Sequence, residues 1–159
     1  MQTVEQLPNA HSTANHPSGL ALDLLLSGAG ALVCLAVCAA LWRTNLFGLA
    51  QPGDVVPYLY VLEMLGVALL GLWGAYRARR QNGRLWALVP WAAGGATAGF
   101  SLLGAFSIGL AFAPVAVLLS LGALAGDVRR RHRPWGGLGM LALAAVAQTA
   151  AMLALVAIH

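Results

Sequence analysis

One acidic residue, Glu63, lies well inside a long apolar segment of this 159-residue chain. A carboxyl group within a membrane is costly, so such a residue is commonly functional or bonded to another helix. Counting helical rises from the expected segment ends places Thr97 and Gln148 at a similar depth, and Tyr60 one helical turn from the acid. We therefore expect Glu63, Thr97, Gln148 and Tyr60 to form an intramembrane polar site.

Three interpretations of Glu63 follow from this placement. The acid is a buried interhelical hydrogen-bonding group, a proton- or cation-coupling site, or, if its helix is shifted, a residue near the membrane surface. Gly66 and Gly74 follow it at i+3 and i+11, on the same side of the helix. Small residues mark the faces on which membrane helices pack, so we expect Glu63 to point into the bundle.

The composition requires lipid as the surrounding medium. Hydrophobic residues make up 60% of the chain and charged residues only 9%, whereas soluble domains carry about 25% charged residues. Crossing about 30 Å of hydrocarbon takes about 20 helical residues, and four apolar stretches reach or exceed that length. The predicted fold class is an all-α integral membrane helical bundle, because a lipid-exposed backbone must satisfy its own hydrogen bonds.

The arginines decide the helix count. Lysine is absent, and eight of the nine arginines form two clusters that flank an apolar stretch of about twice the length of one span. Basic residues stay on the cytoplasmic side, so the chain must cross an even number of times between the clusters. We predict a turn near residues 104–109 and five transmembrane helices, with four helices or a re-entrant segment as the alternative. The expected helices cover about 20–42, 55–76, 85–105, 108–126 and 137–158.

The same reasoning predicts the organisation and the orientation. Residues 1–19 contain no basic residue and are expected to form a flexible cytoplasmic tail, and residues 20–159 a single transmembrane domain. The amino terminus is expected in the cytoplasm and the carboxyl terminus outside, with a bacterial inner membrane as the setting. The topology-determining arginines, which are also expected to contact lipid headgroups, are Arg77, Arg79, Arg80, Arg84, Arg129, Arg130, Arg131 and Arg133.

Glycine pairs indicate how the helices hold together. Gly95 and Gly99 form one G-x-x-x-G pair, and Gly122 and Gly126 form a second. Such pairs let helix backbones approach closely. They are expected to pack within the bundle, and an interface between copies of the chain is the alternative.

Several classes of function are disfavoured by what the sequence lacks. It contains no H-E-x-x-H motif, no C-x-x-C pair and no Gly-rich phosphate loop, and its four histidines lie at chain ends or in expected loops. We expect no metal, no cofactor, no nucleic-acid partner and no enzymatic activity. The leading hypothesis is a non-catalytic accessory or scaffold subunit with membrane lipids, a second copy or a larger membrane protein as partners. The alternatives are a small proton- or cation-coupled transporter that uses Glu63 and, last, an intramembrane enzyme acting on lipid.

Overall fold

Five α-helices make up almost all of the described part of the chain. The computed structural model describes residues 22–44, 56–81, 83–104, 109–130 and 134–158. Within these residues there is no strand, and the predicted all-helical class is confirmed. The helices are α1 (Leu22–Arg43), α2 (Val56–Gln81), α3 (Arg84–Leu103), α4 (Ala113–Arg129) and α5 (Trp135–Ile158), with a short 3-10 helix, η2 (Gly109–Phe112), before α4.

The helices lie within a few residues of their expected positions. The largest differences are that α2 continues through the arginines to Gln81, and that η2 takes the place of the first turn expected for α4. Arginine is a good helix former, so nothing in the sequence stops α2 at the membrane boundary. The predicted tail, residues 1–19, lies outside the described residues.

Within the described ranges, four segments are long and apolar enough to cross a membrane, which is compatible with a small membrane protein. They are Leu22–Arg43, Tyr58–Gln81, Gly109–Arg129 and Trp135–Ala154. The helix α3 is not one of them, although it has 20 residues. Its sequence is rich in Gly, Ala, Ser and Thr, and many of these residues are buried against neighbouring helices. A helix that is enclosed by protein needs less apolar surface than one that faces lipid.

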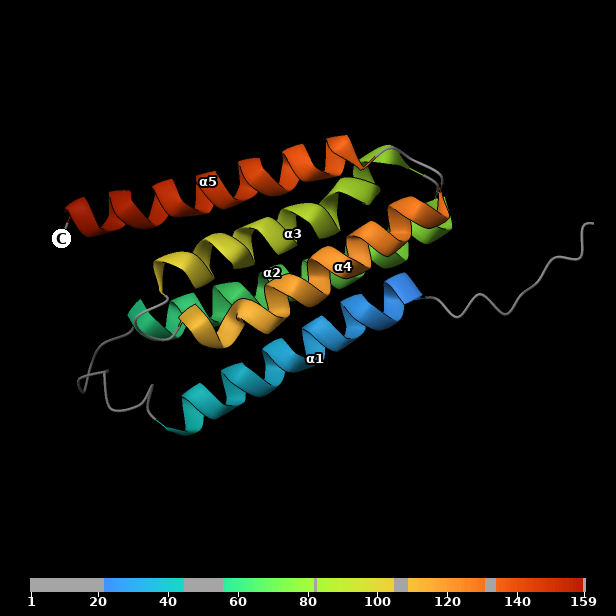
Figure 1. Cartoon of the computed structure of the whole chain (residues 1–159). Coiled ribbons are helices and arrows are strands. Elements are labelled where there is room, and N and C mark those ends of the chain that lie inside the picture. The colour runs from blue at the N-terminus through green and yellow to red at the C-terminus, as the bar shows by residue number, and fades with distance from the viewer. Residues whose placement is uncertain (1–21, 45–55, 82, 105–108, 131–133, 159) are drawn as a thin grey trace, which may run out of the picture.

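The helices α1 to α4 form an antiparallel four-helix bundle, and α5 lies outside it against α3 (Figure 1). Around the bundle, α1 packs on α2 and α4, and α3 packs on the other side of both. The bundle core contains fully buried side chains from all four helices, including Met64, Thr97 and Leu119. Within its most apolar window, α5 is only 6% buried, against 33% or more for the other three spans. Most of the surface of α5 is therefore open to whatever surrounds the bundle.

The chain reverses between α3 and α4 where the sequence predicts a turn. The N–H group of Gly109 donates a hydrogen bond to the carbonyl oxygen of Gly104 at 2.8 Å. A Cβ atom on Gly104 would lie 2.7 Å from the Cα of Gly109, so this close approach requires glycine. The intervening residues, 105–108, lie outside the described part of the chain.

Because consecutive helices run in opposite directions, the described arginines of both clusters lie at one end of the bundle (Figure 1). We call it the arginine-rich end; it contains the end of α2, the start of α3 and the end of α4. The start of α1 lies at this end, and the end of α5 lies at the opposite one. Arg131 and Arg133 lie outside the described residues.

Candidate functional site

Glu63 and Gln148 form a hydrogen-bonded pair between α2 and α5. The Nε2 atom of Gln148 donates to Oε1 of Glu63 at 3.2 Å. Glu63 lies seven residues from the start of α2 and Gln148 ten residues from the end of α5. At about 1.5 Å per residue both lie about 10–15 Å from the same end of the bundle, near the middle of a span. The pair joins two helices that make little other contact with each other.

The pair lies on the outside of the bundle, which corrects the expected direction of Glu63. The Glu63 side chain is exposed and does not point into the core. The expectation relied on Gly66 and Gly74 as markers of one packing face. Gly74 does face α3, where an added Cβ would meet Val89, but a Cβ on Gly66 would meet no atom within 4 Å. A small residue marks a packing face only where another helix approaches it, and at Gly66 none does.

The other two residues predicted for the polar site are placed differently. Thr97 of α3 is fully buried, and its hydroxyl donates to the carbonyl oxygen of Ala93 in its own helix at 2.7 Å. The ring of Tyr60 packs against Phe100, with 6.4 Å between the ring centroids. Of the four predicted residues, the structure therefore brings two together in a hydrogen bond, Glu63 and Gln148.

A second group of polar residues, which was not predicted from the sequence, lies at the arginine-rich end. Asp23 at the start of α1 and Asp127 near the end of α4 are 3% and 6% exposed. Arg129 donates to Oδ2 of Asp23 at 3.0 Å. Arg130 lies 3.9 Å from Oδ1 of Asp127. Two acids and two arginines balance each other, as buried charges require.

We call Asp23, Asp127, Arg129 and Arg130 the charge cluster. Trp91 of α3 extends it into the bundle. Its indole N–H donates to Oδ2 of Asp127 at 2.9 Å, and its side chain is buried. The ring covers Gly137 of α5, where an added Cβ would collide with the indole. Tryptophan near the end of a membrane helix commonly lies at the membrane surface, whereas Trp91 is a hydrogen-bond donor between helices. The charge cluster therefore connects α1, α3, α4 and the first turn of α5.

The pKa of Arg130, which follows the last residue of α4, is shifted by burial and by the neighbouring charges of this cluster. Burial lowers the pKa of its guanidinium, and neighbouring Arg129 lowers it further, while Asp127 and Asp23 act in the opposite direction. Arginine stays protonated in proteins, so the ion pairs persist at neutral pH. The sequence contained one indication of this cluster, because Asp127 lies two residues before the first arginine of the second arginine cluster. Only the antiparallel meeting of α1 and α4 shows that Asp23 joins it.

The predicted glycine pairs lie at contacts inside the chain. A Cβ on Gly95 would collide with the carbonyl oxygen of Leu141 in α5, and one on Gly99 would lie 2.7 Å from that of Ala145. A Cβ on Gly122 would lie 2.5 Å from the hydroxyl of Ser27 in α1. Gly126 is the most loosely packed of the four, with its nearest such neighbour at 3.7 Å. Such close approach stabilises helix pairs in lipid through dispersion contacts.

The described residues contain no group of three His, Cys, Asp or Glu side chains placed to hold a metal ion. Cys34 and Cys38 are buried free thiols whose sulfur atoms lie 4.0 Å apart. Their Sγ atoms lie within hydrogen-bonding distance of carbonyl oxygens of α2, at 3.6 Å from Met64 and 3.5 Å from Val61. The two thiols therefore serve packing between α1 and α2.

No protein-family model, no curated protein and no solved structure matches this chain. The function has to be argued from the arrangement of the chain's own residues.

Proposed function

We propose that this chain is a non-catalytic accessory subunit that packs against a larger membrane protein through the face formed by α2 and α5. The observation that supports this proposal is the exposed Glu63–Gln148 pair near the middle of two spans. A carboxyl group and a carboxamide that face lipid lose hydrogen bonds to water and gain none from hydrocarbon. A partner helix that covers the pair removes this cost.

The shape of the bundle supports the same face. The helix α5 packs mainly on α3 and makes little contact with α2 beyond the Glu63–Gln148 hydrogen bond. A fifth helix attached by one side leaves room for a further helix beside it. The partner expected here is a transmembrane helix with a small-residue surface and one hydrogen-bonding side chain at mid-depth, because such groups join helices in lipid.

Site-specific photo-crosslinking tests this proposal in membranes of the source cell. A photoreactive amino acid at Leu59, which is 57% exposed on α2 one helical turn from Glu63, is expected to give one discrete adduct with another membrane protein. The matched control is the same residue at Leu32, which is 69% exposed on α1. Because α1 packs on α2 and α4 and is not part of the α2–α5 face, the control position is expected to give no such adduct.

The polar pair provides the specificity control. Gln148→Leu removes the donor to Glu63 and is expected to reduce the Leu59 adduct at least fivefold, which corresponds to about 1 kcal/mol. An adduct that forms equally in this variant, or equally from Leu32, argues against a specific interface. An adduct with a second copy of this chain assigns the face to self-association and contradicts the accessory role.

We also propose that all five helices cross the membrane, with the arginine-rich end in the cytoplasm. The support is that α3 runs antiparallel to both α2 and α4 and matches them in extent (Figure 1). Arginine clusters remain on the cytoplasmic side of short loops. Cysteines introduced at Gln81, just before α3, and at Leu102, at its other end, are both exposed and are expected to react with an impermeant thiol reagent from opposite sides. Reaction of both from one side contradicts this topology.

Coupled transport is the second candidate function, because Glu63 is the carboxylate near the middle of a described span. Glu63→Gln keeps hydrogen-bonding capacity and removes the titratable group. A proton or cation flux in proteoliposomes that disappears in this variant supports transport, and no flux in either protein supports the accessory role.

A further inference from the structure

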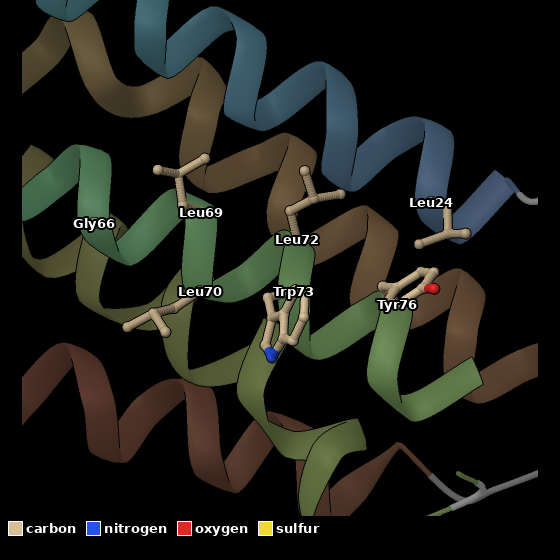
Figure 2. A pocket seen from close by; sticks show the side chains of 7 residues that line it. All are labelled: Leu24, Gly66, Leu69, Leu70, Leu72, Trp73 and Tyr76. Carbon is tan, nitrogen blue, oxygen red and sulfur yellow. The ribbon is translucent and has the colours of Figure 1, made fainter. Parts of the chain in front are cut away.

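An apolar groove lies on the outer surface of the bundle between α1 and α2, and it borders the α2–α5 face. It has a volume of about 930 Å³ and is lined by Leu24 of α1 and by Gly66, Leu69, Leu70, Leu72, Trp73 and Tyr76 of α2 (Figure 2). Its volume lies within the range of about 300–1,000 Å³ that is typical of small-molecule sites. Figure 2 shows Leu24 opposite Tyr76 at the end of the groove near the start of α1.

The groove has the length of one lipid chain in one leaflet. It follows α2 from Gly66 to Tyr76, ten residues or about 15 Å at the helical rise. That is half of the roughly 30 Å of hydrocarbon in a bilayer. The groove therefore extends from the arginine-rich end to about the middle of the membrane, which is the depth that an acyl chain of that leaflet occupies.

Two arginines flank the end of the groove where a lipid headgroup would lie. The guanidinium of Arg77 lies 5.2 Å from the centre of the Trp73 ring and 5.5 Å from that of Trp86. The guanidinium of Arg80 lies 5.0 Å from the ring of Tyr76. Stacking on an aromatic ring restricts a guanidinium and leaves its edge free to bind an anion. Both Trp73 and Tyr76 belong to the groove wall, so the two cations are placed at its opening.

One of these cations has an unsatisfied donor. The Nε atom of Arg77 is buried and has no hydrogen-bond partner in the described structure. A buried donor without a partner is destabilising unless another group satisfies it. The Nε atom is closed to solvent, so a phosphate at the end of the groove would bind Arg77 through its other guanidinium nitrogens and supply negative charge.

We propose that this groove binds an anionic phospholipid from the leaflet at the arginine-rich end. One acyl chain lies along Gly66, Leu70 and Trp73, and the phosphate binds Arg77 and Arg80. The groove borders the α2–α5 face, but lipid binding is measured on the purified chain without a partner protein, so it holds or fails separately from the accessory role. Its occupant differs from the general lipid shell because both charge and chain length are matched by the protein.

Native mass spectrometry of the purified full chain tests the proposal. The probes are phosphatidylglycerol and phosphatidylcholine with identical acyl chains, added to the detergent-solubilised protein. Wild-type protein is expected to retain one phosphatidylglycerol with an affinity about tenfold higher than that for phosphatidylcholine. Equal retention of the two lipids overturns the proposal. So does equal binding of glycerol phosphate, which has the anionic headgroup without chains.

The headgroup contact is tested by charge-matched variants at the end of α2. Arg77→Gln and Arg80→Gln are each expected to weaken phosphatidylglycerol binding about fivefold, or about 1 kcal/mol. The control is Arg79→Gln, which removes the same charge from the other side of the helix. An equal loss in all three variants shows binding by net charge alone and overturns the assigned site.

The chain contact is tested by filling the groove. A Cβ on Gly66 meets no atom within 4 Å, so Gly66→Leu places a side chain in the groove without disturbing the helices. It is expected to reduce binding of phosphatidylglycerol and of phosphatidylcholine at least fivefold with the melting temperature unchanged. Gly139→Leu on α5, where there is equal space, is the control and is expected to bind normally. Normal lipid binding by Gly66→Leu overturns the proposal.

A spectroscopic readout locates the chain within the groove. Phosphatidylglycerol with brominated acyl chains is expected to quench Trp73, so the quenched signal decreases in Trp73→Phe protein. Quenching that is unchanged in this variant, at saturating lipid, places the bound chain elsewhere and overturns the assignment.

Discussion

Replacing Asp127 tests the physical role of the charge cluster most directly. In Asp127→Ala, the indole N–H of Trp91 loses its acceptor while the ring is only 2% exposed. Leaving such a buried donor unpaired costs about 1–3 kcal/mol. The ion pair to Arg130 adds about 1 kcal/mol, because its 3.9 Å separation is long and the arginine retains some exposure. We expect the free energy of unfolding to decrease by about 2–4 kcal/mol.

Two companion variants separate the hydrogen bond from the charge. Asp127→Asn keeps an oxygen that can accept from Trp91 and removes the negative charge, so its loss is expected to be about half as large. Trp91→Phe removes the donor, and in the double variant with Asp127→Ala the effects are expected to be less than additive by about 1 kcal/mol. The difference between the double-variant effect and the sum of the two single effects measures the Trp91–Asp127 hydrogen bond without the ion pair to Arg130.

The assay uses the chain's own buried thiols. Cys34 and Cys38 lie in the core between α1 and α2, so their reaction with a fluorescent maleimide reports loss of helix packing. Unfolding is driven by sodium dodecyl sulfate in mixed micelles, and the transition midpoints are compared. If Asp127→Ala unfolds within about 0.5 kcal/mol of the wild type, or if the two single effects simply add, the reasoning about the charge cluster is wrong.

Three further predictions use the same assay. Gly95→Leu is expected to lose about 3 kcal/mol or more, because its side chain would collide with the backbone of α5, whereas Gly139→Leu is expected to stay within about 0.5 kcal/mol of the wild type. Before any denaturant is added, Cys34 and Cys38 are expected to remain unlabelled, and labelling in the native state would contradict the burial described for them. Glu63→Gln is expected to change the stability of the isolated bundle by less than about 1 kcal/mol, since the side chain is exposed; a larger loss would assign the residue a structural role.

Part of the polar site was predictable from residue type and depth. The apolar segment lengths place Glu63 and Gln148 at comparable depth, and they form a hydrogen bond. Depth follows from counting residues along a helix, which is a property of the local sequence. The direction of Glu63 was not predictable in this way, because it depends on which neighbouring helix lies beside α2 at that level. The expectation from Gly66 failed for this reason.

The charge cluster was likewise predictable only in part from the sequence. Asp127 and the arginines that follow it are adjacent in the sequence, but Asp23 lies more than one hundred residues away and meets Arg129 only through the antiparallel packing of α1 and α4. The role of Trp91 also depends on helix rotation. An aromatic residue near a helix end is expected at the membrane surface, and here it turns inward to Asp127.

The sequence by itself determined the helical class, the approximate helix boundaries and the reversal between α3 and α4. These depend on how many consecutive residues are apolar and on where glycine and arginine interrupt them, and both are local quantities. Only the tertiary structure decided that α3 is enclosed, that α5 lies outside the four-helix bundle, and which polar side chains face one another. Those features depend on the rotation and crossing of whole helices, and a helix with apolar residues on every side carries no stripe that specifies its inward face.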